Sequence, residues 1–401
     1  MKNKYTLTRL ACFVGFVVQA IVNNFLPILF VALQDNYDLN YEQLARLIVI
    51  NFGAQMVIDF LTPKITKHLG YRITAFLSQF VASLGLILMG ILPILMTNKY
   101  LAISISAVIY ACGSGLMEGI VSPMVEILPT ENQGGTMCIL HSFYCWGQAF
   151  TIIVTTVLLL LFGNKNWSFI PIVWAVIPFV NAFSFLKVPI IEPPSDKKLA
   201  TLSQLLKRPQ FLGFMVMMLC AGASEIAMAQ WASLFAQRGL GVSKFIGDLA
   251  GPCAFALLMA TGRIFYGINA KKLDFKKSMT VLSIFAIICY LGVALTKSAV
   301  LSLVFCALCG FAVSIYWPAI YSKGAVDFSD GGMVMYSVFA MCGDIGCALG
   351  PWVLGIVADS LGLKMGFGVT AVFPVIMLIS TLLCVGSKKC CKISKNNIKY
   401  L

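Results

Sequence analysis

Twelve stretches of about 20 or more mostly apolar residues follow one another along the chain, separated by short polar breaks. A helix needs roughly 20 such residues to cross the hydrocarbon core of a bilayer, so each stretch predicts one spanning helix. The predicted spans are 8–33, 43–62, 73–97, 99–125, 134–162, 168–188, 209–235, 245–268, 276–296, 298–321, 332–358 and 363–386. The predicted fold class is an all-α polytopic membrane protein with two six-helix bundles.

The composition excludes several other classes of protein. Apolar residues make up 59% of the 401 and charged residues 11%, whereas soluble domains carry about 25% charged residues. The sequence has no Gly-x-x-x-x-Gly-Lys-Ser/Thr loop and no soluble segment long enough to bind ATP or to carry an enzyme active site. Most of the 14 cysteines lie within the spans and form no ligand-spaced cluster with histidine. We therefore expect neither an enzyme nor a metal or cofactor site.

The basic residues predict how the chain is oriented. If the N-terminus is cytoplasmic, 22 of the 29 Lys and Arg residues fall on the cytoplasmic side. The seven others (29 less 22) are Arg46, Lys99, Lys165, Arg238, Lys244, Lys297 and Lys364. This bias follows the positive-inside rule and predicts two cytoplasmic termini, so the net charge of +13 does not indicate nucleic-acid binding. Short loops favour a bacterial inner membrane, and we expect a monomer.

The most polar stretch between spans, EPPSDKKLATLSQLLKRPQ at 192–210, has six spans on each side. It predicts four segments, namely an N-terminal bundle at 1–190, a cytoplasmic linker at 191–208, a C-terminal bundle at 209–387 and a basic cytoplasmic tail at 388–401.

The two halves repeat several landmarks at offsets of 195 to 204 residues. Gly115 and Pro123 correspond to Gly310 and Pro318, Gly134-Gly135 to Gly331-Gly332, and Asp59 to Arg263. We expect the glycine and proline pairs to mark close packing and helix bends. A parallel duplication of this kind is typical of transporters that bind substrate between their halves.

Three carboxylates lie deep in predicted spans, namely Glu118, Glu225 and Asp344, and His141 accompanies them. An ionised carboxylate at mid-membrane costs about 2.5–3.5 kcal/mol, so these groups should face the protein interior and are candidates to bind H⁺ or Na⁺. No Lys or Arg is expected at mid-span, because Arg263 is placed close to a cytoplasmic helix end. The site is therefore predicted to suit a neutral polar or cationic solute.

The arrangement of twelve spans as six plus six resembles the major facilitator superfamily. The segment PKITKHLGYR at 63–72 resembles that superfamily's loop after the second helix. It keeps Gly70 and Arg72, but it has Pro63 in place of the first glycine and Lys67 in place of the aspartate. The resemblance implies transport by alternating access.

Within that superfamily, GSGLMEGIVSP at 113–123 resembles the fourth helix of the fucose–proton symporter family. VNNFLP at 22–27 and LHSFYCWG at 140–147 resemble its first and fifth helices. The resemblance implies that Glu118 is the protonation site and that His141 and Tyr144 face a sugar. The family's first-helix aspartate falls on Pro27 here, so Glu118 would act alone or with Glu225 or Asp344.

The remaining candidates have structural alternatives. Gln19, Asn23, Asn24 and Gln148 could hydrogen-bond sugar hydroxyls or neighbouring helices, and Trp231 and Trp317 could stack on a sugar ring or pack in the core. Asp59 and Arg263 are predicted gating or inter-bundle charges. Gly222 and Ser224 flank Glu225 and are consistent with a locally broken helix.

The sequence therefore predicts a secondary active transporter for a small neutral polar solute, a sugar, coupled to H⁺ symport. Na⁺ coupling and facilitated diffusion stay open. Two other functions also stay open. One is a drug or cationic-compound efflux antiporter, although span five lacks the Gly-Pro-x-x-Gly-Gly stretch of such exporters. The other is a non-transporting membrane scaffold or receptor.

Overall fold

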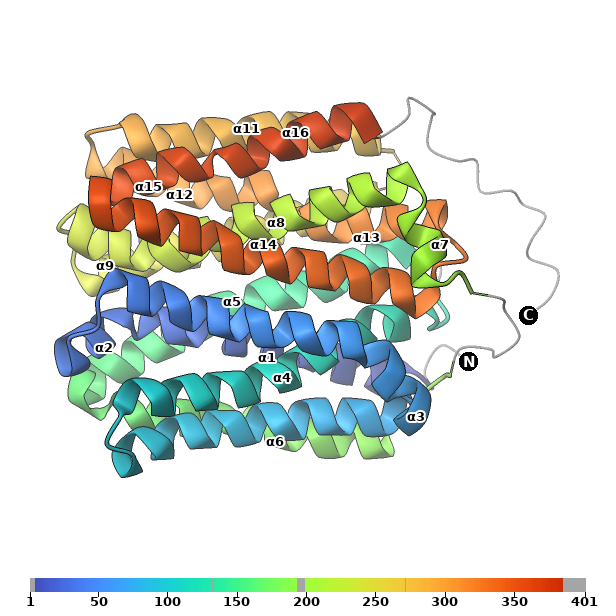
Figure 1. The fold of residues 1–401 in the computed structure, drawn as a ribbon, viewed down its shortest axis with the longest axis horizontal. Helices are drawn as coiled ribbons and strands as arrows, with labels where there is room; N and C mark the ends of the chain where they lie inside the picture. The colour runs from blue at the N-terminus through green and yellow to red at the C-terminus, as the bar shows by residue number, and fades with distance from the viewer. Residues whose placement is uncertain (1–3, 131–132, 193–198, 271, 385–401) are drawn as a thin grey trace.

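The computed structural model describes residues 4–130, 133–192, 199–270 and 272–384 (Figure 1). The predicted tail at 388–401 and linker residues 193–198 lie outside this part of the chain. The N-terminal half comprises α1 (Thr6–Ile28), α2 (Phe30–Tyr37), α3 (Tyr41–Leu95), α4 (Lys99–Glu126), α5 (Gln133–Phe162), the 3₁₀ helix η1 (Asn164–Phe169) and α6 (Ile170–Lys187). The short helix α7 (Leu202–Leu206) follows in the linker.

The C-terminal half contains the remaining elements. They are α8 (Pro209–Leu234), the π-turn η2 (Phe235–Gly239), α9 (Lys244–Asp248), the π-turn η3 (Leu249–Cys253), α10 (Ala254–Asn269), α11 (Phe275–Leu295), α12 (Ala299–Val313), α13 (Tyr316–Asp327), α14 (Gly332–Leu361), α15 (Leu363–Thr370) and α16 (Val372–Cys384). The described chain therefore consists of helices and their connections, as the sequence predicts.

Eleven helical segments of the described chain are long and apolar enough to span a membrane. One of them, α3, has 55 residues and is interrupted at Gly70, where φ is +74° and ψ is 164°. At 1.5 Å per residue it would extend about 80 Å, more than twice the ~30 Å hydrocarbon core. α3 therefore supplies two crossings, and the described part of the chain has the twelve spans that the hydropathy pattern predicts.

The break at Gly70 explains why the loop segment at 63–72 keeps the glycine and the arginine of the superfamily motif. A positive φ is readily adopted only by glycine, so Gly70 lets the chain reverse between the second and third spans. Arg72 then donates from Nη1 to the carbonyl oxygens of Leu186 and Val188, at 2.8 and 2.9 Å. These carbonyls lie at the C-terminal end of α6, where the last carbonyl groups of a helix have no helical N–H partner. The motif thus ties the loop to the neighbouring span.

The two halves pack side by side, with most of the N-terminal half in the lower part of Figure 1 and the C-terminal half above it. Across the interface α3 packs against α14 and α5 packs against α10. The repeated glycines have equivalent roles. A Cβ on Gly115 would lie 2.9 Å from the Gln55 oxygen, and one on Gly310 would lie 2.1 Å from the Phe255 oxygen. Each glycine allows close packing of two helices within its own half.

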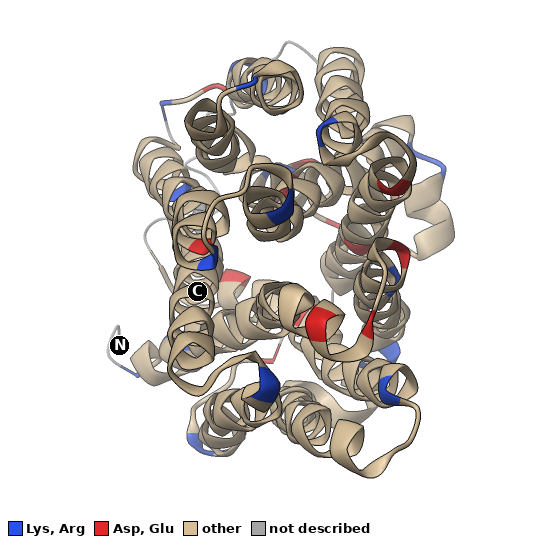
Figure 2. Cartoon of the chain, turned by 90° about the vertical axis from the view of Figure 1, so that its left-hand side faces the viewer, with Lys and Arg blue, Asp and Glu red and all other residues tan. Residues whose placement is uncertain are grey.

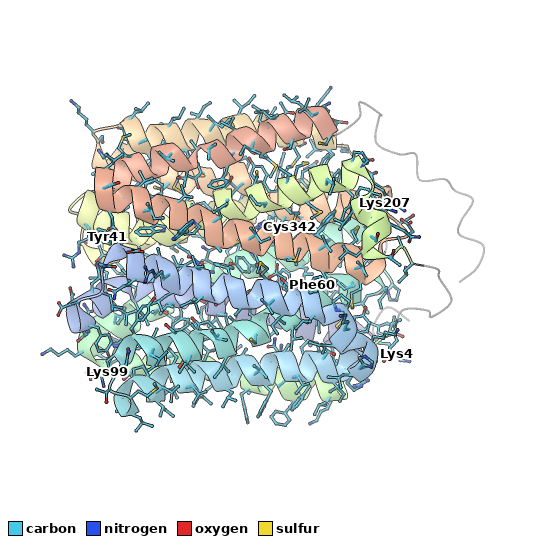
Figure 3. The ribbon with its side chains drawn as sticks, in the orientation of Figure 1. Lys4, Tyr41, Phe60, Lys99, Lys207 and Cys342 are labelled. Atoms are coloured by element: carbon cyan, nitrogen blue, oxygen red, sulfur yellow. The ribbon has the colours of Figure 1, made fainter. Side chains whose placement is uncertain are left out.

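The outer surface is apolar, as a lipid-facing surface requires. Large apolar side chains point outward along the helices, and Leu161, Leu295 and Leu383 are 71–79% exposed. Charged positions are sparse on the ribbon (Figure 2). Lys4 and Lys207 lie at the end of the bundle that carries α7, here called the linker end, and Lys99 lies at the opposite end (Figure 3). The chain is therefore an integral membrane protein.

Candidate functional site

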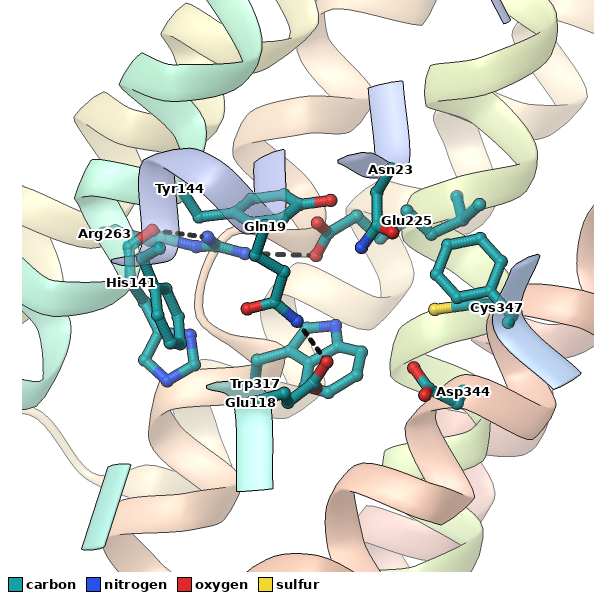
Figure 4. Close-up of a pocket in the computed structure, with 13 residues that line it drawn as sticks. Gln19, Asn23, Glu118, His141, Tyr144, Glu225, Arg263, Trp317, Asp344 and Cys347 are labelled. Atoms are coloured by element: carbon teal, nitrogen blue, oxygen red, sulfur yellow. Dashed lines mark hydrogen bonds and ion pairs between the residues drawn. The ribbon is translucent and has the colours of Figure 1, made fainter. Parts of the chain in front are cut away.

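A pocket lies between the two halves, and both contribute to its wall (Figure 4). Its lining residues are Phe16, Gln19, Asn23, Phe52, Glu118, His141 and Tyr144 from the N-terminal half, and Glu225, Ile226, Arg263, Trp317, Asp344 and Cys347 from the C-terminal half. The pocket has a volume of about 40 Å³, which is room for about three water molecules at roughly 10–15 Å³ each. The pocket is therefore small in this conformation.

Contacts between the halves close the molecule on both sides of this pocket. At the opposite end Arg238 Nη2 lies 3.2 Å from the Asp35 carboxylate, and Lys244 Nζ donates to the Ile28 oxygen at 3.0 Å. At the linker end Gly267 of α10 packs so closely on Cys138 of α5 that a Cβ would lie 2.8 Å from it. Contacts between the halves therefore bound the pocket at both ends.

Glu118 reaches the pocket from a helix that glycines allow to pack tightly. A Cβ on Gly113 would lie 2.4 Å from the Ala82 nitrogen, so only glycine lets α4 approach α3 this closely. Glu118 is 9% exposed, and Gln19 Nε2 donates a hydrogen bond to its carboxylate (Figure 4). The other amide atom, Gln19 Oε1, is buried without a partner among the described residues.

Arg263 lies in the pocket, which corrects the expectation that it sits near a cytoplasmic helix end. It is 2% exposed and forms an ion pair with Glu225 at 3.1 Å. The prediction that no basic side chain reaches mid-depth is therefore wrong. α10 places Arg263 on its buried face, and the long side chain extends from there into the space between the halves.

The surroundings of Arg263 explain how a guanidinium is accommodated in this interior. Pro318 has no N–H, so the carbonyl of Ser314 four residues earlier lacks its helical donor. Arg263 Nε donates to that oxygen at 2.9 Å, and Nη1 donates to the His141 oxygen at 2.8 Å across the interface. Together with Glu225, these acceptors engage all three nitrogens of the guanidinium.

Asp59 also lies deeper than its predicted position near a cytoplasmic helix end. The helix continues through Pro63 to the break at Gly70, so Asp59 lies well inside it. One carboxylate oxygen from each of Asp59, Glu118 and Asp344 lies within 4.8 Å of the others. At 4.8 Å and an effective dielectric constant of about 20, two unit charges of like sign repel by roughly 3.5 kcal/mol. These three groups cannot all be ionised without a bound cation.

The structure brings most of the other predicted residues to the pocket. Gln19, Asn23, His141, Tyr144, Glu225, Trp317 and Asp344 line it together with Glu118. Asn24, Gln148 and Trp231 are buried but lie outside the lining. Asn24 donates to the Tyr144 hydroxyl at 3.2 Å and so supports a lining residue. Trp231 packs against Tyr41, with ring centroids 6.3 Å apart.

The predicted break beside Glu225 is wrong, because α8 is continuous from Pro209 to Leu234. Gly222 instead permits close packing: a Cβ there would lie 2.1 Å from the Gly343 oxygen of α14. Four lining residues were not predicted, namely Phe16, Phe52, Ile226 and Cys347. An apolar side chain in a span has the same sequence signal whether it faces lipid, core or pocket.

Two six-helix bundles that enclose a polar pocket between them define a membrane transporter of the two-bundle class. The chain belongs to the major facilitator superfamily, whose sequence model matches residues 11–351. Members of this superfamily are transporters and not enzymes. No curated protein matches the chain.

Several solved structures share the fold at low sequence identity. The fucose:proton symporter of Escherichia coli is 17% identical, with 96% of this chain and 100% of the symporter covered and a TM-score of 0.73. The proton:xylose symporter bound to 6-bromo-6-deoxy-D-glucose is 10% identical, with 94% and 95% covered and a TM-score of 0.77. A bacterial homologue of the human lysosomal transporter Spinster, inward-facing and occupied, is 15% identical, with 96% and 97% covered and a TM-score of 0.72.

Proposed function

We propose that the protein is a secondary active transporter that moves a small neutral polar solute, a sugar, together with a proton. The solute binds in the pocket between the halves, and rocking of the two bundles exposes the pocket to either side in turn. Glu118 carries the coupling proton. The positive-inside bias supports two cytoplasmic termini, and the short loops support a bacterial inner membrane.

The observation that carries this proposal is the pairing of Glu118 with Gln19. An amide offers both a donor and an acceptor. Gln19 Nε2 donates to the carboxylate, and Gln19 Oε1 is left without a partner. After a turn of the amide, that oxygen can accept a hydrogen bond from the protonated acid. Glu118 can therefore be stabilised in both protonation states at little cost, as a proton carrier requires.

The state of Arg263 supports a neutral solute. Its three nitrogens donate to Glu225, Ser314 and His141, and its charge is paired with the Glu225 carboxylate, so the pocket has no unpaired guanidinium charge for an anionic substrate. Besides its carboxylates and Arg263, the lining offers amide, imidazole and phenol groups from Gln19, Asn23, His141 and Tyr144, which suit sugar hydroxyls. Trp317 and Phe52 add flat apolar surface of the kind that packs on a sugar ring.

Uptake into proteoliposomes tests this proposal with the wild-type protein and a panel of labelled hexoses and pentoses. We expect at least one sugar to enter, and to accumulate above its external concentration when the outside is acidic. A protonophore should abolish the accumulation but not the entry.

Two other results would contradict the proposal. The lining has three carboxylates and one arginine, which would also suit a cationic compound. No uptake of any sugar in the panel, together with export of a lipophilic cation, would indicate the efflux antiporter. No movement of any solute would indicate a scaffold or receptor.

A further inference from the structure

We propose that Asp59, Glu118 and Asp344 together form one binding site for the coupling cation, assembled across the two halves of the protein. The ligand is a hard cation that takes oxygen ligands, either a proton shared among the carboxylates or Na⁺. Asp59 and Glu118 belong to α3 and α4 of the N-terminal half, and Asp344 belongs to α14 of the C-terminal half. The proposal rests on the cation coupling proposed above and extends it from Glu118 to three residues.

The geometry suits a single ion. Three atoms that all lie within 4.8 Å of one another have a common point no farther from each than 4.8 Å divided by √3, about 2.8 Å. Ca²⁺ takes carboxylate oxygens at about 2.3–2.6 Å, and Na⁺ has a similar radius. A small closure of the cluster therefore brings all three oxygens to ligand distance. The cluster adjoins the pocket, because Glu118 and Asp344 also line it.

The unpartnered oxygens of the aspartates are an independent indication of a ligand. Asp59 is 0% exposed, and no N–H or O–H group of a described residue other than the two aspartates donates to either of its carboxylate oxygens or to Oδ2 of Asp344. The two aspartate carboxyl groups lie within hydrogen-bond contact of each other. The other fully buried carboxylates are satisfied. Glu225 pairs with Arg263, and Asp248 accepts from Thr156 at 2.8 Å. A buried carboxylate without any donor is costly, so the unsatisfied oxygens indicate a site for a cation.

No charged group around the three carboxylates takes the place of the proposed cation in the described part of the chain. On α8, Glu225 is neutralised by Arg263 of α10. On α13, Tyr321 is the titratable group near the three carboxylates, and on α14 it is Cys347. The only charged residue of α6 is Lys187 in its last turn, and Lys364 of α15 donates to the Thr296 oxygen. Among the described residues, no basic side chain forms an ion pair with Asp59, Glu118 or Asp344.

A site divided between the halves explains how cation binding and conformation are linked. When the bundles separate on one side, Asp344 moves with α14, away from Asp59 and Glu118. The site then loses a ligand and releases its cation. Binding energy is thus available only in arrangements that bring the three carboxylates together, as coupling requires.

Proton release from the purified, full-length protein tests the site without any transport. NaCl or choline chloride is added to the protein in weak buffer, with a pH indicator present. If Na⁺ is the ligand, the wild type should release protons with NaCl only, and Asp59→Asn and Asp344→Asn should release none. If a shared proton is the ligand, neither salt should act. In that case the wild type should take up about one more proton than either variant on acidification from about pH 9 to 6, where exposed carboxylates do not titrate.

Two further variants keep this experiment decisive. Asp274→Asn makes the same substitution at a helix N-cap, where Asn caps as well as Asp, and should behave like the wild type. Asp344→Glu keeps a carboxylate at this position and should retain a weakened response. This variant replaces the Asn variants in the test if they do not fold. Equal proton release and uptake by the wild type and the Asp59 and Asp344 variants would overturn the site.

Sugar accumulation separates failure of this site from failure of the transport proposal. We expect Asp59→Asn and Asp344→Asn to lose gradient-driven accumulation at least tenfold while they still exchange sugar. If they accumulate sugar like the wild type and Glu118→Gln does not, Glu118 couples alone and the three-residue site is wrong. If the wild type accumulates no sugar, the transport proposal fails, and the proton measurements still decide the site.

Discussion

Arg263 and Glu225 form a buried ion pair whose partners come from two helices of the same half, while a third contact, from Arg263 to the His141 carbonyl, crosses to the other half. Such a pair is costly to break, because removal of one partner leaves a buried charge uncompensated. The pair therefore fixes the geometry of one wall of the pocket without offering a free charge to the substrate.

A double-mutant cycle tests this reading of the pair. We expect Arg263→Met or Glu225→Leu alone to destabilise the protein by about 3–5 kcal/mol, and the double variant to recover most of that loss. The apparent unfolding temperature in detergent measures the effect. Additive losses in the double variant would show that the two side chains act independently.

At this scale, the sequence predicts which acids face the interior, because an acid in a span is costly anywhere else. Glu118, Glu225 and Asp344 all line the pocket as expected. The sequence does not predict the depth of Asp59 and Arg263, because the distance to the nearest polar break is a poor measure of depth. The helix that carries Asp59 continues past that break to Gly70, so Asp59 lies farther from the membrane surface than the break suggests.

At the scale of helices, glycines decide how closely neighbours pack. A Cβ on Gly346 would lie 1.9 Å from the Leu219 oxygen, whereas a Cβ on Gly53 would meet nothing within 4 Å. α14 therefore depends on Gly346 for its approach to α8, and the same approach positions Asp344 beside the pocket.

Two alanine substitutions compare these sites. Gly346→Ala should force α14 away from α8 and lower the unfolding temperature, because the clash is with backbone and cannot be relieved by a side-chain rotation. Gly53→Ala should be neutral or should stabilise by about 0.5–1 kcal/mol, since Ala is favoured over Gly in a helix. Equal unfolding temperatures for the two variants would contradict this account of the packing.

The linker segment 199–208, which contains α7, is fastened to the loop before α14 by a surface ion pair that depends on pH. Arg208 Nη1 and Nη2 donate to Asp330 at 2.8 and 2.5 Å, and Ala200 N–H donates to the Asp330 backbone oxygen at 2.8 Å. The hydrogen bonds from Arg208 lower the pKa of Asp330 below its usual value. Because the folded-state pKa is depressed, this contribution is present above about pH 4, the unfolded value, and is lost as the pH falls further.

Asp330→Asn should therefore reduce the protection of the 199–208 segment from proteolysis at neutral pH. The difference from the wild type should shrink as the pH falls below about 4 and disappear once Asp330 is protonated in the folded protein. The effect should be small, because the pair is exposed and solvent screens it. Digestion with an acid-tolerant protease across this range measures it, and a difference that grows as the pH falls would refute the assignment.

The order and number of the spans could be predicted because the bilayer sets a helix length that hydropathy reports directly. The interruptions within spans could not. The break between α12 and α13 lies at Ser314 and Ile315, three residues before Pro318. The proline indicates a bend in this span but not a complete interruption of the helix. The π-turn η3 precedes α10 in an apolar run that has the same hydropathy whether it is regular or not.

At the scale of the whole molecule, transport requires that the contacts at either end of the pocket open in turn. Asp35 and Arg238 join the halves at the opposite end. A short bis-methanethiosulfonate, which forms a disulfide with each thiol and releases methanesulfinate, should cross-link Asp35→Cys to Arg238→Cys and stop sugar exchange, and reductant should restore it. Exchange that continues after complete cross-linking on a gel would show that this end does not need to open.

The central claim is that Glu118 links proton movement to the exposure of the pocket. The most direct measurement is the ratio of gradient-driven sugar accumulation to sugar exchange without a gradient, for the wild type and Glu118→Gln in the same proteoliposomes. The Gln side chain has nearly the same size, resembles the protonated acid and cannot exchange a proton. The account predicts that Glu118→Gln exchanges sugar but does not accumulate it, whereas accumulation equal to the wild type would contradict it.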